Sequence, residues 1–257
     1  METPRKPLPT RVDETPDLAP AYGAALRAGL AALGLDLSAG ARAAIDGHVR
    51  LLLAWTEAIN LTAIREPGAV ALGHVVDSLT AVPLLRGLGI DRFLDLGSGG
   101  GYPGIPLAAA LPAARAVLAE PIGKKAGFLR TAITATGLDG VAEAAAVRSE
   151  TLAADARHRG RWPAVTARAV ATLADLVELS FPLLAPGGVL VAWKRGDLAA
   201  DLAAAERAML AMGGGRLDVQ PVVVPGLDGH RLVVAQARGR VPATFPRDPA
   251  ARKRRPW

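Results

Sequence analysis

The spacing of apolar residues changes near residue 91. Upstream, apolar positions recur three and four residues apart, as on one face of a helix. We expect Ser38 to be the N-cap of a helix that ends near Asn60, with the apolar face Ile45, Val49, Leu52 and Ile59. A further helix is predicted over residues 69–85. Residues 21–90 are therefore predicted to form a helical N-terminal cap.

Downstream, short apolar runs alternate with helix-like runs. The expected strands are 92–96, 115–120, 141–148, 163–168, 189–194, 219–224 and 231–237, and the expected helices are 104–111, 122–136, 173–184 and 198–212. This alternation predicts a mostly parallel sheet with helices on both faces, in an α/β domain over residues 91–240. Only a turn containing Pro225, Gly226 and Gly229 separates the last two strands, so we expect an antiparallel edge hairpin.

The two ends have the composition of tails. Residues 1–20 are rich in proline and charge and are predicted to be disordered. Residues 241–257 form a basic C-terminal tail in this interpretation. The chain shows no signal-peptide h-region and no run of about 18 uninterrupted apolar residues, so we expect a cytoplasmic protein without a membrane span.

The amino-acid composition limits the classes of partner and of catalytic chemistry to be considered. The chain has 257 residues, 51% of them apolar, which suits one large domain. Its formal net charge of +6 favours polyanionic partners such as nucleic acid, although solubility alone would also explain it. There are no cysteines, which excludes disulfides, thiolate metal sites and a cysteine nucleophile. The four histidines lie far apart, so no metal site is expected.

A carboxylate and a cluster of glycines follow the first predicted strand: Asp95, Gly97, Gly99, Gly100 and Gly101. Glycine lets the backbone approach a flat polar ligand and adopt positive φ. The spacing of Gly99, Gly101 and Gly104 also matches a dinucleotide loop, with Glu120 placed to bind a ribose, so this loop alone leaves NAD open.

Three features favour S-adenosylmethionine (SAM). Asp95 suits a ligand that carries an ammonium group and a sulfonium, and it would repel a pyrophosphate. Pro103 and Pro106 bracket the next helix start, and residues 184–190 form a turn that is common before the fifth strand of SAM-dependent enzymes. Ser149 and Glu150, after the third strand, could frame the adenine or simply cap a helix. The expected fold is a Rossmann-like, seven-stranded class I SAM-dependent methyltransferase.

Six ordered strings of the chain resemble the bacterial RsmG (GidB) family of small-subunit ribosomal RNA guanine-N7 methyltransferases. They lie at residues 60–64, 74–78, 95–107, 168–171, 193–196 and 230–234. The resemblance implies cofactor contacts at Gly97, Tyr102, Ser149, Glu150 and Arg168, and methylation of one guanine near the decoding centre of 16S rRNA. The Lys- and Pro-rich C-terminal signature of the family has fewer basic residues at 241–249 of this chain, and the basic residues 252–255 are expected to compensate for it by attracting RNA.

Guanine N7 has a free lone pair, so the transfer needs no general base, nucleophile or metal. We therefore predict that Arg168, Lys194 and Arg231 position the substrate through phosphates or guanine O6. Asn60, otherwise a helix C-cap, and His74, otherwise a packing residue, are further candidates for RNA contact, as is Arg247.

We expect a monomer that acts on 16S rRNA or the small ribosomal subunit. The alternatives are a SAM-dependent methyltransferase of another substrate and a nicotinamide-dependent oxidoreductase.

Overall fold

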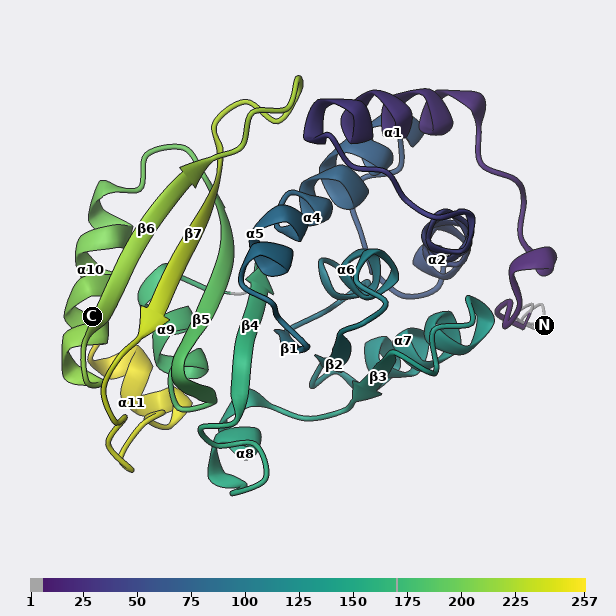
Figure 1. Cartoon of the computed structure of the whole chain (residues 1–257). Coiled ribbons are helices and arrows are strands. Elements are labelled where there is room, and N and C mark those ends of the chain that lie inside the picture. The colour runs from purple at the N-terminus through teal and green to yellow at the C-terminus, as the bar shows by residue number, and fades with distance from the viewer. Residues whose placement is uncertain (1–6, 170) are drawn as a thin grey trace.

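The computed structural model describes residues 7–169 and 171–257, and its centre is a seven-stranded sheet (Figure 1). The strands are β1 (Arg92–Leu96), β2 (Arg115–Ala119), β3 (Ala142–Ala145), β4 (Trp162–Arg168), β5 (Leu184–Arg195), β6 (Gly215–Pro221) and β7 (His230–Ala237). Their order is β3-β2-β1-β4-β5-β7-β6, and β7 is antiparallel to both of its neighbours. The predicted parallel sheet with an antiparallel edge hairpin is confirmed.

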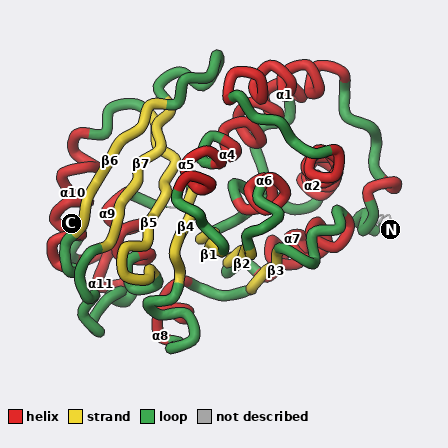
Figure 2. Tube along the Cα trace, viewed as in Figure 1, coloured by secondary structure: helices red, strands yellow, loops and turns green. Residues whose placement is uncertain are grey.

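Helices cover both faces of the sheet (Figure 2). They are α6 (Gly104–Ala110), α7 (Gly123–Ala135), α8 (Ser149–Ala154), α9 (Leu173–Ser180) and α10 (Ala199–Ala211). Side chains of β1 alternate between two cores: Phe93 packs with α6 and α7, whereas Leu94 packs with α9 and α10. The strand is buried on both faces, which is why its sequence reads as an apolar run.

The N-terminal helices pack on the α6 and α7 side of the sheet. They are α1 (Pro20–Leu33), α2 (Ala39–Thr56), α3 (Pro67–Val70), the π-helical segment η2 (Ala71–Val76), α4 (Asp77–Leu79) and α5 (Val82–Gly87). The Ser38 side chain caps α2 as predicted, accepting from Ala41 N at 3.1 Å. The helix ends at Thr56 with Glu57 as its C-cap, so Asn60 is not the cap. The helix predicted over 69–85 is present as a helical run from α3 to α5, which has π-helical geometry at η2 and a turn at Thr80 and Ala81.

One helical run, Pro67–Gly87, is long and apolar enough to cross a membrane by length and composition alone. Most of it is buried inside the fold, and Val76 lies so close to α1 that a Cβ on Gly29 would come within 2.4 Å of Val76 Cγ2. Its apolar character therefore serves the protein core.

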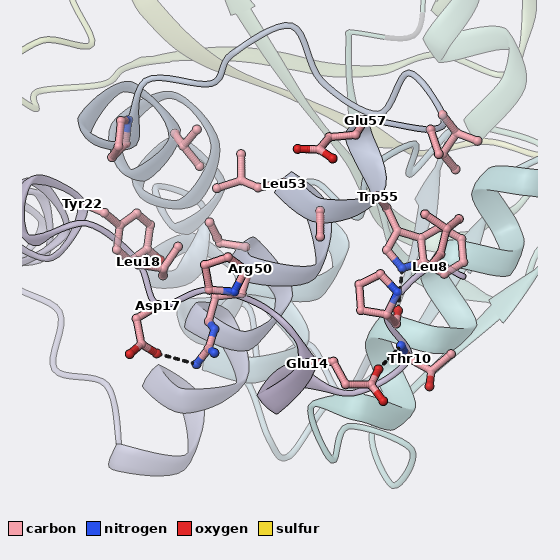
Figure 3. A pocket seen from close by; sticks show the side chains of 18 of the residues that line it. Leu8, Thr10, Glu14, Asp17, Leu18, Tyr22, Arg50, Leu53, Trp55 and Glu57 are labelled. Atoms are coloured by element: carbon pink, nitrogen blue, oxygen red, sulfur yellow. Dashed lines mark hydrogen bonds and ion pairs between the residues drawn. The ribbon is translucent and has the colours of Figure 1, made fainter. Parts of the chain in front are cut away.

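The prediction of disorder for residues 1–20 is wrong for residues 7–20, and residues 1–6 lie outside the described residues. A short 3-10 helix, η1 (Val12–Glu14), packs beside α2, and Trp55 Nε1 donates to Pro9 O at 2.7 Å. Arg50 pairs with Asp17 at 3.0 Å in the wall of a hollow of about 1520 Å³, which this segment and α2 line together with residues of α1, α3 and α7 (Figure 3). Contacts to distant residues hold this segment in an ordered conformation, although its composition alone predicts disorder.

The C-terminal segment is folded as well. It contains α11 (Pro249–Arg254) and packs beside α9, where Arg247 forms an ion pair with the fully buried Glu178 side chain. The predicted tail is therefore a docked element.

Candidate active site

The glycine loop joins β1 to α6 at the carboxyl edge of the parallel strands. Gly97, Gly99 and Gly101 have φ values of 70°, 54° and 92°, which favour glycine strongly. Gly97 N donates to Ala119 O at 2.8 Å, which fixes the loop to the end of β2. A Cβ on Gly99 would meet nothing closer than Gly97 O at 3.8 Å, so this part of the loop faces open space.

Gly100 and Gly101 face the cap instead. A Cβ on Gly100 would lie 2.8 Å from Leu52 Cδ1, and one on Gly101 would lie 2.7 Å from His48 Nε2. His48 Nε2 donates to Gly100 O at 2.7 Å, and burial lowers the pKa of this histidine to about 4. Because these two glycines lack side chains, helix α2 can pack directly against the loop.

Glu120, at the end of β2, lies against the loop as its motif predicts. Its Oε2 accepts from Gly99 N at 2.9 Å and its Oε1 accepts from Ile122 N at 2.8 Å. A carboxylate has about four lone-pair sites, so two acceptor positions remain for ribose hydroxyls.

Asp95 has a different role from the one its sequence position suggests. The residue is fully buried, and its carboxylate accepts from Thr166 Oγ1 at 2.8 Å and from Gly104 N at 3.2 Å. Burial raises the pKa of Asp95 to about 6, despite hydrogen bonds that favour the ionised form. Asp95 therefore stabilises the loop through these buried hydrogen bonds. The expectation that it faces an ammonium group is corrected.

Ser149 and Glu150 begin α8, after β3. Ser149 Oγ donates to Glu150 Oε2 at 3.3 Å, while Arg252 of the C-terminal segment donates to Glu150 Oε1 at 2.6 Å. Burial is the largest single influence and opposes ionisation of Glu150, but the hydrogen bond and charge of Arg252, together with hydrogen bonds from the main chain and Ser149, outweigh it and lower the pKa of that carboxyl. The C-terminal segment thus reaches a residue of the predicted adenine site.

Tyr102, Arg168 and His74 meet between the cap and the sheet. The rings of His74 and Tyr102 stack with centroids 4.7 Å apart, and the Arg168 guanidinium lies 5.2 Å from the Tyr102 centroid. Asp77 and His230 extend this cluster. Asp77 Oδ2 accepts from Arg168 Nη1 at 2.9 Å, and Asp77 Oδ1 lies 2.9 Å from His230 Nδ1. Nothing in the sequence indicates these contacts, and Asp77 stands in it only within the string 74–78 that carries part of the family resemblance.

The contacts of His74 define its tautomer. Arg168 Nη2 can only donate, so His74 Nδ1 accepts at 3.2 Å and Nε2 carries the proton toward Thr62 Oγ1 at 2.6 Å. Burial first, and then the charge of Arg168, lower the pKa of His74 to about 4. Burial raises the pKa of Tyr102, whose buried hydroxyl has no hydrogen-bond partner within residues 7–169 and 171–257. Neither ring is suited to proton transfer at neutral pH.

The other predicted substrate residues lie in different surroundings. Lys194 pairs with Asp201 of α10 at 2.9 Å, and Arg231 lies opposite Lys194 across β5 and β7, so both are at the carboxyl edge. Asn60 is exposed in the loop after α2. Arg247 is engaged with Glu178, so the prediction that it contacts RNA is not supported.

Arg195 is an exposed cation at this edge that is not among the predicted site residues. Arg195 ends β5 and lies in register with His230. Its place in the string 193–196, which carries part of the family resemblance, was the available signal.

The sheet order with a reversed β7, the glycine loop after β1 and the acidic residue after β2 define a class I SAM-dependent methyltransferase. An O-methyltransferase from Bacillus cereus, solved in complex with SAH, shares the fold with a TM-score of 0.54 and 17% identity, covering 81% of this chain and 95% of that chain.

The chain belongs to the GidB family, rRNA small subunit methyltransferase G, whose model matches residues 42–225. It is 40% identical over 205 residues to ribosomal RNA small subunit methyltransferase G of Roseiflexus sp. (strain RS-1), covering 80% of this chain and 87% of that protein. It is also 40% identical over 234 residues to the protein of the same name from Deinococcus radiodurans, covering 90% of each. Family membership excludes the nicotinamide-dependent alternative.

Proposed function

We propose that this protein transfers the methyl group of SAM to N7 of one guanine near the decoding centre of 16S rRNA, in the cytoplasm. The observation that carries the proposal is membership of a family named for small-subunit rRNA methylation. The gathering of Glu120, Tyr102, Arg168 and His74 around the glycine loop supports it.

The residues around the loop fit SAM. Gly97 and Gly99 expose backbone on the open side of the loop, and the free lone pairs of Glu120 suit ribose hydroxyls. Ser149 begins the helix beside the expected adenine. Arg168 has Nε and one Nη2 hydrogen without a described acceptor, next to Tyr102. These donors suit an anionic or carbonyl oxygen of the cofactor or the guanine.

SAM supplies a methyl group that its sulfonium already activates. Because guanine N7 carries no proton, the remaining task of the protein is to align the two reactants, which can contribute about 7–11 kcal/mol. A neutral His74 and a protonated Tyr102 agree with a reaction that needs no acid or base. Arg231 and Arg195 would hold phosphates or guanine O6 at the edge of the sheet.

The test is transfer of labelled methyl groups to small subunits that lack the modification, with fully modified subunits as the control. Reduction with borohydride followed by aniline cleavage then identifies N7-methylguanine and its position. We expect one labelled guanine per subunit. Tight SAM binding without transfer, or label on another atom, would contradict the proposal.

A further inference from the structure

Asp77 connects the cap to three strands at the edge of the sheet where the parallel strands have their carboxyl ends. Its carboxylate contacts Arg168 on β4 and His230 on β7, each at 2.9 Å, and its main-chain carbonyl accepts from Trp193 Nε1 on β5 at 2.7 Å. These partners lie 91, 153 and 116 residues away along the chain. One cap residue therefore joins the strand ends beside the glycine loop.

The pair that Asp77 forms with Arg168 is almost dry. The exposed fractions of the two side chains are 5% and 12%. Burying two charges is costly, and such a pair adds little to stability compared with a well-packed apolar replacement. Stability alone is therefore a weak reason for this pair to lie beside Tyr102 and the predicted cofactor loop.

We propose that Asp77 is a positioning residue for the methyl transfer; this inference rests on the proposed function. Asp77 holds the Nη1 side of Arg168, together with the carbonyl of Gly73 at 3.0 Å, while His74 Nδ1 accepts from Nη2. The guanidinium is thereby fixed over the Tyr102 ring. The orientation of its remaining donors, Nε and one Nη2 hydrogen, is therefore fixed at the edge of the sheet.

Asp77 also balances charge. Methyl transfer moves positive charge from the sulfonium to the purine, so an uncompensated guanidinium at this edge would oppose the reaction. The carboxylate, 2.9 Å from Arg168, offsets that charge where little water is present to screen it. Asp77 thus affects both the alignment of Arg168 and the field at the purine.

The experiment compares Asp77→Asn with the wild type in methyl transfer to small subunits. Because a small misplacement of an aligned group is costly, we expect kcat to fall about 10- to 100-fold. The Kd for SAM, measured by calorimetry, should change by less than about threefold because Arg168 keeps its charge. Asp46→Asn is the matched control: it removes a carboxylate paired with Arg42 at 2.9 Å within α2, and we expect wild-type kcat.

A double-mutant cycle separates positioning from a merely structural role. If Asp77 acts through Arg168, adding D77N to Arg168→Gln should lower kcat by less than about twofold further, because the partner is already gone. Losses in kcat that multiply in the double variant, or a folded D77N with wild-type kcat, would overturn the inference. If D77N does not fold, Arg168→Lys is the alternative variant. Lysine keeps the positive charge but lacks the planar set of guanidinium donors that Asp77 holds in place. Wild-type kcat in this variant would refute the proposal.

Measurements on the wild type show whether the proposed function or only the role of Asp77 fails. A wild type that binds SAM but does not methylate small subunits contradicts the proposed function. A wild type that methylates them, beside an equally active D77N, contradicts only the role of Asp77.

Discussion

Replacing Arg247 by alanine tests whether this residue anchors the C-terminal segment or contacts RNA. Arg247 Nε donates to Glu178 Oε1 at 2.9 Å, its main-chain N donates to the same oxygen at 2.7 Å, and its Nη2 donates to Oε2 at 2.6 Å. Its guanidinium also lies 4.5 Å from the Trp257 ring centroid. R247A would leave the Glu178 carboxylate buried with only the main-chain N and Trp257 Nε1 as partners.

Removing one partner of a buried ion pair costs about 3–5 kcal/mol, and we expect about 3 because the Arg247 side chain is partly exposed. For a protein of this size that loss corresponds to a fall of about 6–12 °C in Tm. If the segment detaches first, its cleavage by trypsin near Arg252 should accelerate while the Tm falls less. Arg254→Ala, an exposed residue of the same helix, is the control and should change neither measurement.

The effect of R247A should depend on pH. Burial alone would raise the pKa of Glu178, but the hydrogen bonds from Arg247 and Trp257 hold it below its ordinary value. The pair therefore stabilises the fold above the ordinary pKa of glutamate, and this contribution is lost as pH falls through the lowered pKa. The deficit of R247A should be largest at neutral pH and shrink on acidification. A Tm within about 2 °C of the wild type at neutral pH, with unchanged cleavage and weaker RNA binding, would refute the reasoning.

Four further substitutions test the loop and the edge of the sheet. Gly101→Ala should destabilise the fold by about 2–4 kcal/mol in urea titrations, because its Cβ would clash with His48, whereas Gly99→Ala should cost only about 1 kcal/mol and mainly weaken SAM binding in calorimetry. Asp95 has a raised pKa, so it favours the fold most at low pH; the stability of the wild type relative to Asp95→Asn should fall by up to about 3 kcal/mol as pH rises from about 4 to above 6. Arg195→Ala should reduce the slope of log affinity for RNA against log salt by about 1, with SAM binding unchanged.

Much of the sheet was predictable because its signals are local. The alternation of apolar runs and helices identified all seven strands, and the glycines and proline between β6 and β7 indicated the hairpin. The approach of Glu120 to Gly99 also follows from the motif, since both stand at carboxyl ends of neighbouring parallel strands.

What the sequence could not supply depends on partners far along the chain. The carboxylate of Asp95 stands at the predicted place, but it turns inward to accept hydrogen bonds, one of them from Thr166, which lies 71 residues away. Arg247 reads as a free cation until Glu178, 69 residues earlier, is placed beside it. Residues 7–20 likewise become ordered through Trp55 and Arg50 on α2. Composition describes a segment alone and carries no information about such contacts.

The run of glycines between β1 and α6 satisfies two demands at once. Gly99 leaves the open side of the loop clear, whereas Gly100 and Gly101 leave room for Leu52 and His48 of α2. A side chain at either of the latter positions would push the cap away from the loop without touching the cofactor site. The cap that carries His74 and Asp77 is therefore packed directly against the loop, so a displacement of one must displace the other. This coupling gives cap residues influence over the geometry of methyl transfer even where they contact neither reactant.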